Sequence, residues 1–503
     1  MTNALYNALF APHADNHAVF LIADDGAQIT YADFVARVAQ MAHALTDAGV
    51  RPGDRVVVQA PKLVDSNALY GAAVQIGAVY LPLNTAYTQS ELSYFVDDAQ
   101  PTLVVCAVDS LAEVALICDG KVKVMTLAAD GTGTLSSSAD TCASQYPTIA
   151  RGPDDLAALL YTSGTTGRSK GAMMSQKNLL SNAESLTDLW QITKQDRLIH
   201  ALPIFHTHGL FVALNTALLA GAQVRFMAAF DLDRIIADLP VSTLLMGVPT
   251  FYTRLLSDGR LNKDLTKNMR LFISGSAPLL AETHNAFANR TGHRILERYG
   301  MTETGMITSN PYDGERLAGT VGYALPGTEV RITEEGRPEA RGQIGMIEVR
   351  GDNVFQGYWQ MPAKTAEELR DDGFFITGDL GVQSDDGRIS IVGRQKDLII
   401  AGGYNIYPKE VEEVINDIDG VLESAVFGVP HPDFGESVLA AVVVEDEGLS
   451  SEEIAGLGMP KLARFKHPRH YILTDALPRN TMGKVQKNVL RERYAGQSTS
   501  ALP

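Results

Sequence analysis

The sequence predicts a large α/β domain followed by a small α+β domain. Its 503 residues exceed what a single hydrophobic core usually holds, so we expect two or more domains. Helical and strand patterns alternate over residues 30–110, which indicates a mostly parallel sheet covered by helices on both faces. After about residue 310 the chain is rich in strands and turns, and roughly the last hundred residues have the pattern of a compact α+β unit.

The first elements follow from local patterns. "TYADFVARVAQMAHALTDAGV" begins at the helix N-cap candidate Thr30, carries apolar residues at helical spacing and closes on Gly49. "DRVVVQA" is then expected to be a buried strand, "SNALYGAAVQIGA" a helix and "PTLVVCA" another strand. This order is typical of strand–helix–strand units.

The alternation continues before the pattern changes. Strands are expected within "STLLMGVP" and "MRLFISGSAP", and "GVPTFYTRLL" is expected to be a helix. β-strands separated by turns are expected within "TEVRITEEGRPEARGQIGMIEVRG" and "GRISIVGR". The last part is expected to hold the helix "PKEVEEVINDI", with Val411, Val414 and Ile415 on one face, and the strands "VLESAVFGVP" and "VLAAVVVE". The polar stretch 131–141 ("GTGTLSSSADT") is expected to be a loop.

Composition excludes several classes of function. Hydrophobic residues make up 45% of the chain and charged residues 20%, as in ordinary globular proteins, and the net charge of −17 speaks against a nucleic-acid partner. Cys106, Cys118 and Cys142 lack metal-ligand spacing, so we expect reduced, mostly buried thiols. The N-terminus lacks a signal-peptide pattern and no run of eighteen apolar residues occurs, so we expect a cytoplasmic protein without a membrane partner.

The stretch "YTSGTTGRSK" (161–170) has the composition of an anion-binding loop. Its glycines let backbone amides approach an anion, its hydroxyls add donors, and Lys170 adds charge. The spacing does not fit the Walker pattern G-x-x-x-x-G-K-[ST], because Ser169 stands where the second glycine should be and Gly171 follows the lysine. Taken alone, the stretch could also be a flexible surface loop.

Four further motifs give this loop its context. They are "YGMTET" (299–304), "TGD" (377–379), "GRQKDLIIAGGYNIYPKEVE" (393–412) and "LPRNTMGKVQKNVLR" (477–491). In order and separation, the five motifs resemble those of the acyl-adenylate-forming superfamily, which includes acyl-CoA synthetases, luciferases and the adenylation domains of peptide synthetases. The resemblance implies a large N-terminal domain, here 1–394, and a small mobile C-terminal domain, here 395–503. It also implies that a carboxylate and ATP form acyl-AMP and pyrophosphate, and that coenzyme A then displaces AMP.

The resemblance assigns the residues around ATP. The loop would hold the β- and γ-phosphates through Lys170 and through Ser163, Gly164, Thr165, Thr166 and Gly167. Thr302 would hydrogen-bond the α-phosphate, and Glu303 would ligate Mg²⁺, for which a carboxylate is a suitable oxygen ligand. Without the motif, Glu303 would be taken for an acid at the start of a helix.

Further residues are expected around the nucleoside. Tyr299 would lie against adenine, with the backbone of "SGSAP" (274–278) beside it. Asp379 would accept both ribose hydroxyls, and Arg394 would reach the ribose or the phosphates.

The C-terminal motifs imply a moving catalytic lysine. Lys484 would contact the attacking carboxylate and the α-phosphate, and Lys396 would be the hinge about which the small domain rotates. After rotation, Gly402 and Gly403 would line the pantetheine tunnel, since glycine suits a loop close to a ligand. In relatives this lysine is a target of acetylation, so an acetyltransferase and a deacetylase are expected partners; taken alone, Lys484 could be one solvated lysine among several.

Three features bear on the acid. "FHTHG" (205–209) resembles the family's histidine motif at the acyl channel, which assigns His206 to catalysis and to the substrate; on a strand His206 and His208 would share a face and could suggest a metal site. Arg254 follows Thr250 by one helical turn, and Ser276 is expected beside the same pocket. "PTFYTRLL", "LFISGSAPLL" and "ALPIFHTHGLF" resemble malonyl-CoA synthetases.

These features predict a pocket for a dicarboxylic acid. An arginine aimed into an acyl pocket would pair with the second carboxylate of malonate, and methylmalonate is expected to fit as well. Arg254 could instead be a surface residue paired with an acid. Three other functions stay open at this point: a short- or medium-chain monocarboxylate–CoA ligase, an adenylation domain that loads a carrier protein, and a non-catalytic nucleotide-binding protein.

Overall fold

In the computed structural model, residues 2–162, 169–334, 336–432, 434–445, 449–480 and 483–495 are described. The chain packs into two compact units. Unit 1 comprises Met1–Ala318, Gly322–Val330 and Val349–Phe375, and unit 2 comprises Gly319–Val321, Arg331–Glu348 and Ile376–Pro503. This division assigns more of the chain to the smaller unit than the expected boundary after residue 394. The two units are defined by how the chain packs and not by how it moves, so the rotation about Lys396 stays a prediction.

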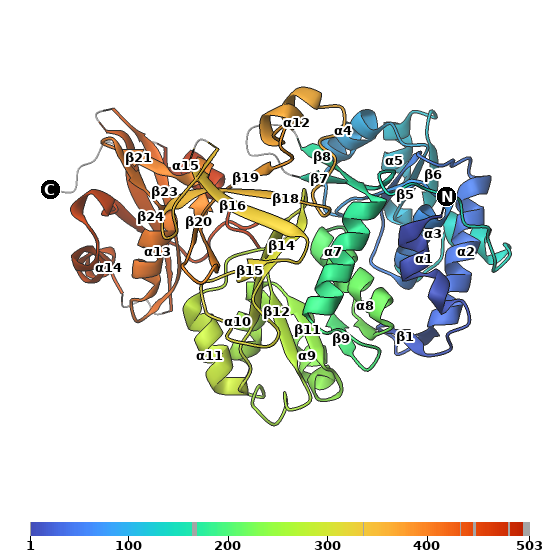
Figure 1. Ribbon diagram of the computed structural model, residues 1–503, viewed down its shortest axis with the longest axis horizontal. Coiled ribbons are helices and arrows are strands. Elements are labelled where there is room, and N and C mark those ends of the chain that lie inside the picture. Colours follow the sequence, from blue (N-terminus) through green and yellow to red (C-terminus); the bar gives the residue numbers. More distant parts are fainter. Residues whose placement is uncertain are drawn as a thin grey trace. The chain divides into compact units, whose positions relative to one another are not determined.

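Unit 1 contains a nine-stranded sheet with the order β15-β14-β13-β12-β11-β9-β10-β1-β2 (Figure 1). Its central strands from β1 to β13 run parallel, and antiparallel partners close both edges. The strands are β1 (Val19–Ile22), β2 (Gln28–Thr30), β9 (Arg197–His200), β10 (Gln223–Phe226), β11 (Leu244–Gly247), β12 (Leu271–Ser274), β13 (Leu296–Met301), β14 (Gly305–Ser309) and β15 (Tyr323–Ala324).

A second sheet of unit 1 has six strands in the order β6-β5-β3-β4-β7-β8. All neighbours are parallel except β7 and β8, which form an antiparallel pair. The strands are β3 (Arg55–Gln59), β4 (Val79–Pro82), β5 (Leu103–Cys106), β6 (Lys123–Thr126), β7 (Leu156–Thr162) and β8 (Lys170–Ser175). The predicted mostly parallel α/β organisation is therefore confirmed.

Helices cover these sheets in the order that the sequence patterns predict. In α2, Thr30 caps the first turn, and its hydroxyl and the Asp33 carboxylate satisfy each other's backbone amides. The α-helices of unit 1 are α1 (Ala4–Leu9), α2 (Tyr31–Asp47), α3 (Val64–Ile76), α4 (Gln89–Ala99), α5 (Leu111–Cys118), α6 (Thr134–Asp140), α7 (Gln176–Leu189), α8 (Asn215–Ala220), α9 (Leu232–Asp238), α10 (Pro249–Ser257), α11 (Ala281–Thr291) and α12 (Pro362–Glu368).

One local prediction is wrong. The stretch 131–141 is not only a loop, because α6 occupies most of it. Leu135 and Ala139 are buried in the core of unit 1, and the Ser136 hydroxyl donates to the Asp65 carboxylate at 3.2 Å. Tertiary burial of two apolar side chains therefore outweighs the weak helix propensity of a Ser-rich stretch.

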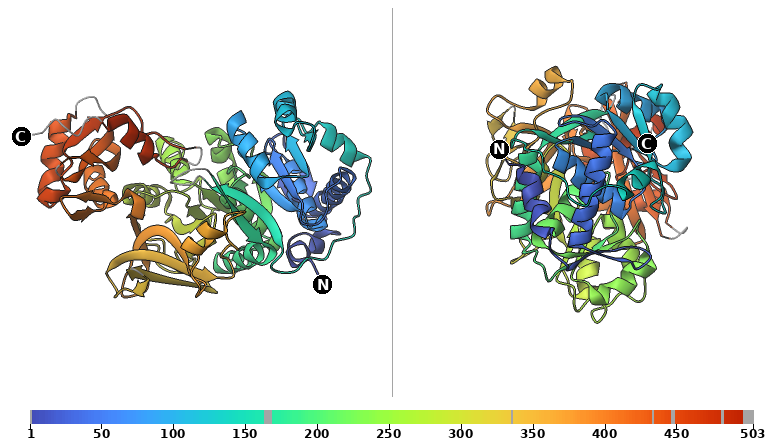
Figure 2. Two further views of the ribbon diagram at one scale, coloured as in Figure 1. Left: turned by 90° about the horizontal axis from the view of Figure 1, so that it is seen from above. Right: turned by 90° about the vertical axis from the view of Figure 1, so that its right-hand side faces the viewer.

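Unit 2 is built mainly from two further sheets (Figure 2). The first has the order β17-β16-β18-β19-β20, and most of its residues belong to unit 2; in the second, β22-β21-β24-β23 are neighbours and β25 pairs with β24. The strands are β16 (Thr328–Glu334), β17 (Arg337–Pro338), β18 (Ile344–Gly351), β19 (Phe375–Gln383), β20 (Ile389–Arg394), β21 (Ile399–Ala401), β22 (Tyr404–Ile406), β23 (Val421–His431), β24 (Gly435–Val444) and β25 (His470–Leu473). The helices are α13 (Pro408–Asn416), α14 (Ser451–Gly458) and α15 (Lys487–Tyr494).

The structure bears on two expectations from the sequence, which concern membrane-spanning segments and the state of the cysteines. No helix in the described part of the chain is long and apolar enough to cross a membrane. The three cysteines are free; Cys106 and Cys118 are buried and Cys142 is half-buried. Burial raises the pKa of the Cys106 thiol to about 11, which disfavours the reactive thiolate.

Candidate functional site

The Ser- and Thr-rich loop connects two antiparallel strands. Thr162 at the end of β7 pairs with Lys170 at the start of β8. A Walker loop leads from a strand into a helix, so the topology agrees with the failed Walker spacing. Residues 163–168, which include the predicted phosphate-binding residues Ser163, Gly164, Thr165, Thr166 and Gly167, lie outside the described residues.

Lys170 lies in a cluster of charged and phenolic side chains. Its Nζ is 3.2 Å from Oε1 and 3.3 Å from Oε2 of Glu368, and it lies 4.0 Å from the centroid of the Tyr358 ring. The Tyr358 hydroxyl donates to Oε2 of Glu368 at 2.5 Å and is 3.1 Å from Oε1 of Glu303. The loop lysine and the predicted magnesium ligand are therefore joined by a Lys–Glu–Tyr–Glu chain within unit 1.

Thr302 and Glu303 lie in the tight turn between β13 and β14, not at the start of a helix. The turn needs glycine at position 300, because a Cβ there would lie 2.1 Å from the carbonyl oxygen of Gly305. Glu303 is buried, and its carbonyl oxygen accepts a hydrogen bond from the Phe355 amide at 2.8 Å. Tyr299, half-buried on β13, packs against the core of unit 1.

Glu303 fits a hard divalent cation. Its carboxylate offers oxygen ligands, which Mg²⁺ prefers. The described residues contain no group of three or more His, Cys, Asp or Glu side chains placed to hold a metal. Mg²⁺ is usually held by one or two carboxylates together with phosphate oxygens and water, and a single carboxylate such as that of Glu303 fits this arrangement.

The loop after β12 brings Ser276 against His208. Ser276 has a φ of 70°, a left-handed conformation that is rare for a residue with a side chain. Its Oγ lies 3.2 Å from Nδ1 of the buried His208. Burial, and then the charge of Arg298, lowers the pKa of His208, so its imidazole is neutral at physiological pH.

Arg298 is a site residue that the sequence reasoning missed. It is only 4% exposed, and burial lowers the pKa of its guanidinium to about 9. The guanidinium packs against Gly275, where a Cβ would lie 2.3 Å from Cζ. Among the described residues, Nε and Nη2 of Arg298, Nε2 of His208 and Oγ1 of Thr207 have no hydrogen-bond partner. Arg298 lies close enough to His208 for its charge to affect that histidine's pKa, and His208 in turn contacts Ser276, so a buried positive charge lies near the Ser276 loop.

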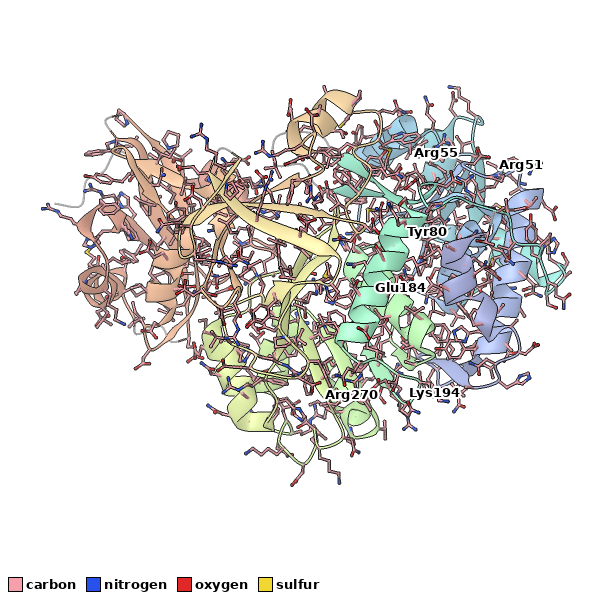
Figure 3. The ribbon with its side chains drawn as sticks, in the orientation of Figure 1. Arg51, Arg55, Tyr80, Glu184, Lys194 and Arg270 are labelled. Carbon is pink, nitrogen blue, oxygen red and sulfur yellow. The ribbon has the colours of Figure 1, made fainter. Side chains whose placement is uncertain are left out.

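Several other arginines of unit 1 are paired with carboxylates. Arg270, labelled in Figure 3, donates to the buried Asp196 carboxylate at 2.7 Å and to the carbonyl of Trp190 at 3.1 Å. A cavity of about 240 Å³ beside Asp24 also contains two arginines, but each is paired with an aspartate. In contrast, Nε and Nη2 of the buried Arg298 guanidinium have no hydrogen-bond partner among the described residues. An anionic ligand would supply both the acceptors and the opposite charge that this group lacks.

Arg254, the residue predicted to bind the second carboxylate, is exposed on α10, and its role in the acid site stays a prediction. The buried face of α10 consists of Phe251, Tyr252 and Leu255, so Arg254 points to the exposed side. Its Cζ lies 5.2 Å from the centroid of the Phe230 ring. A signal for Arg298 was present in the sequence: Glu297 and Arg298 are charged residues in a strand of a parallel sheet, where apolar residues are expected.

His206 and His208 do not lie on a strand. His208 begins the π-helical segment η3 (His208–Leu214), and His206 precedes it in an irregular turn. His206 is half-buried and its ring lies 4.7 Å from that of Phe205. The alternative of a metal site assumed that the two histidines share one face of a strand, and that assumption is wrong.

Unit 2 brings together Asp379 and Arg394. The two residues pair across β19 and β20, and Nε of Arg394 lies 2.7 Å from Oδ1 of Asp379. Asp379 is buried, and Gly378 before it has a φ of 74°, which permits the turn of the "TGD" motif. The pair is a preformed acceptor and donor that fits ribose hydroxyls or a phosphate.

The other predicted residues of unit 2 lie on turns. Gly402 and Gly403 form the exposed two-residue turn of the β21–β22 hairpin, with φ values of 59° and 83°. Lys396 is exposed on the 3₁₀ turn η5 (Gln395–Asp397). Lys484 is exposed in a tight turn, in which its amide donates to Oδ1 of Asn480 at 3.0 Å.

Comparisons with known proteins show the family to which the chain belongs. A family model described as "AMP-binding enzyme" matches residues 10–359, and "AMP-binding enzyme C-terminal domain" matches residues 410–484. The ATP-bound crystal structure of MatB from Rhodopseudomonas palustris is 54% identical, with a TM-score of 0.97 over 99% of this chain and 100% of that one. The malonate–CoA ligase of Arabidopsis thaliana is 34% identical over 84% of this chain and 75% of its own length. Feruloyl-CoA synthase of an Amycolatopsis species is also 34% identical, over 97% of both chains.

Proposed function

This chain belongs to the AMP-binding enzyme family and is an AMP-forming acid–thiol ligase, and we propose that its acid is malonate. The observation that carries this proposal is the buried guanidinium of Arg298, whose Nε and Nη2 have no partner among the described residues. A dicarboxylic acid supplies the missing anion with its second carboxylate. The similarity to MatB and to the malonate–CoA ligase of Arabidopsis thaliana supports the same choice.

The pocket selects for charge as well as for size. The planar guanidinium can donate two parallel hydrogen bonds to one carboxylate, and Nε2 of His208, whose pKa responds to the charge of Arg298, also has no partner among the described residues. A monocarboxylate such as acetate leaves Arg298 buried and unpaired. Methylmalonate retains both carboxylates and adds one methyl group, so we propose it as a second substrate.

The reaction has two steps. A carboxylate oxygen of malonate attacks the α-phosphorus of ATP, the bond to the β-phosphate breaks, and pyrophosphate leaves with its electron pair. The thiolate of coenzyme A then attacks the acyl carbon of malonyl-AMP, and AMP leaves. The first step brings two anions together, so fixed donors and cations must offset their repulsion.

We propose the following roles for the chain's own residues in that step. Thr302 hydrogen-bonds the α-phosphate and Glu303 holds Mg²⁺, which neutralises phosphate charge when bound. Lys170 and the loop before it hold the β- and γ-phosphates. Tyr299 lies against adenine.

The remaining roles belong to unit 2. We propose that Asp379 accepts the ribose hydroxyls while Arg394 holds it in place, as their 2.7 Å ion pair suggests. Lys484 contacts the attacking carboxylate. The segment from residue 395 onward turns about Lys396 between the two steps, so that Gly402 and Gly403 replace Lys484 beside the reacting centre. Acetylation of Lys484 would remove its charge and stop the first step.

An acid panel tests the substrate assignment. AMP, pyrophosphate and acyl-CoA are measured with malonate, methylmalonate, acetate and octanoate, each with ATP, Mg²⁺ and coenzyme A. We expect the highest kcat/KM with malonate and turnover with methylmalonate. Preferential turnover of acetate or octanoate would show a monocarboxylate–CoA ligase instead. Transfer of ¹⁸O from labelled malonate into AMP tests the adenylate step separately.

A further inference from the structure

Glu368 occupies the position of a counter-ion to the loop lysine. Both of its oxygens lie within 3.3 Å of Lys170 Nζ. Burial raises the pKa of the Glu368 carboxyl, but hydrogen bonds from Tyr358 and Lys364 and the charge of Lys170 outweigh burial and lower it. Glu368 is therefore ionised at neutral pH.

Glu368 does not depend on Lys170 alone. Its Oε1 lies 3.0 Å from Nζ of Lys364, one turn earlier on α12, and its Oε2 accepts the Tyr358 hydroxyl at 2.5 Å. Tyr358 is fixed in turn, because its amide donates to the Thr365 hydroxyl at 2.9 Å. If Lys170 turned to another anion, Glu368 would keep two partners and would not be left as an uncompensated charge.

We propose that Glu368 is a specificity-determining residue for nucleotide binding, a built-in carboxylate that competes with the β- and γ-phosphates for Lys170. The proposal rests on the proposed role of Lys170 as a phosphate-binding residue. A negative charge beside Lys170 disfavours a second anion there and reduces the positive charge available to the phosphates. The competition weakens the binding of ATP and helps pyrophosphate to leave after the first step.

The proposal separates ligands by the phosphates they carry. ATP and pyrophosphate contain the groups that Lys170 is expected to hold, whereas AMP does not. Replacing Glu368 by glutamine removes the competing charge but keeps a side chain of the same shape that can still accept from Tyr358. Only ligands with β- or γ-phosphates respond to such a change.

The test is equilibrium binding by calorimetry, with Mg²⁺ and without acid, so that no reaction occurs. For Glu368→Gln we expect the Kd of ATP and of pyrophosphate to fall about two- to fivefold, the range given by a partly exposed ion pair, while the Kd of AMP stays unchanged. Glu367→Gln is the matched control, because Glu367 pairs with the exposed Lys364 on the same helix and should leave all three affinities unchanged.

A double-mutant cycle tests whether Glu368 acts through Lys170. In a Lys170→Gln background, Glu368→Gln should have little further effect on ATP binding. An unchanged or weaker ATP affinity in Glu368→Gln, with AMP affinity intact, would overturn the inference. A uniform loss of affinity for ATP and AMP would also overturn it, since that would show a structural role. If wild type bound ATP no more tightly than AMP, the β- and γ-phosphates would contribute nothing to affinity. That result would overturn the proposed role of Lys170 itself.

Discussion

Replacing Arg298 by methionine should remove the enzyme's preference for a diacid. Methionine has a similar length, fills the space against Gly275 and lacks donors. Burial lowers the pKa of Arg298 from 12.5 to about 9, which corresponds to a cost of roughly 5 kcal/mol for holding the cation in the empty pocket. The carboxylate of a bound diacid offsets much of that cost.

The expected loss follows from the hydrogen bonds. Two charge-assisted bonds, from Nε and Nη2, contribute about 1.5–3 kcal/mol each. Arg298→Met should therefore lower kcat/KM for malonate roughly 10²- to 10⁴-fold. Acetate makes no contact with the guanidinium, so its kcat/KM should stay the same or rise. The variant should melt no lower than wild type, because it no longer buries an unpaired charge.

The assay is AMP release under kcat/KM conditions with both acids, with Arg254→Met as the matched control. Arg254 is exposed and its guanidinium lies over the Phe230 ring, so if the second carboxylate binds Arg298 this substitution should change kcat/KM less than about threefold. A large loss of malonate turnover in Arg254→Met, with Arg298→Met unaffected, would refute the reasoning and restore Arg254 as the diacid residue.

Three further predictions follow from other parts of the site. Lys484→Gln should slow malonate-dependent exchange of pyrophosphate into ATP by about 10²-fold or more while sparing the reaction of malonyl-AMP with coenzyme A; equal losses in both steps would contradict its assigned role. Asp379→Asn should raise the KM for ATP about tenfold or more, because the ribose acceptor loses its charge, and an unchanged KM would remove Asp379 from the nucleotide site. Burial, and then the charge of Lys62, lowers the pKa of His200 to about 3. In the unfolded chain the imidazole takes up a proton near pH 6.5, whereas in the folded chain it stays neutral down to about pH 3. The free energy of unfolding therefore loses nothing to His200 above pH 6.5 and falls as the pH drops from 6.5 toward 3. Between pH 7.5 and 5.5, the free energy of unfolding measured in urea should fall by about 1.4 kcal/mol less in His200→Gln than in wild type. Equal falls in the two proteins would contradict the lowered pKa of His200.

Local patterns predicted the elements well where local chemistry decides them. The N-cap of α2 at Thr30 and the apolar period of α13 are properties of short windows, and both elements form as expected. The helix α6 was missed because its stability comes from burial of Leu135 and Ala139, and burial by distant residues is not visible in a window of polar residues. The motifs pointed to the stretches that carry Lys170 and Glu303, but the hairpin, the turn and the side-chain partners found there could not be foreseen.

The acid pocket shows the same limit more sharply. Arg254 was predicted from the resemblance of "PTFYTRLL" to malonyl-CoA synthetases and from its place one helical turn after Thr250. That prediction stays open, because the period of α10 alone does not say which face meets a pocket. Arg298 packs against Gly275 and lies close enough to His208 for its charge to lower that histidine's pKa, and these residues are distant in the chain and come together only in the folded protein. Charged residues within a buried strand were the available signal.

The central claim is that a buried, unpaired arginine selects the second carboxylate of the acid. The most direct measurement is the ratio of kcat/KM for malonate to that for malonamate, which has nearly the same shape but carries a neutral amide at the distal end. The account predicts a ratio on the order of 10² in wild type and near one in Arg298→Met. Equal kcat/KM values for the two acids in wild type would contradict it, because the distal charge would then contribute nothing to recognition.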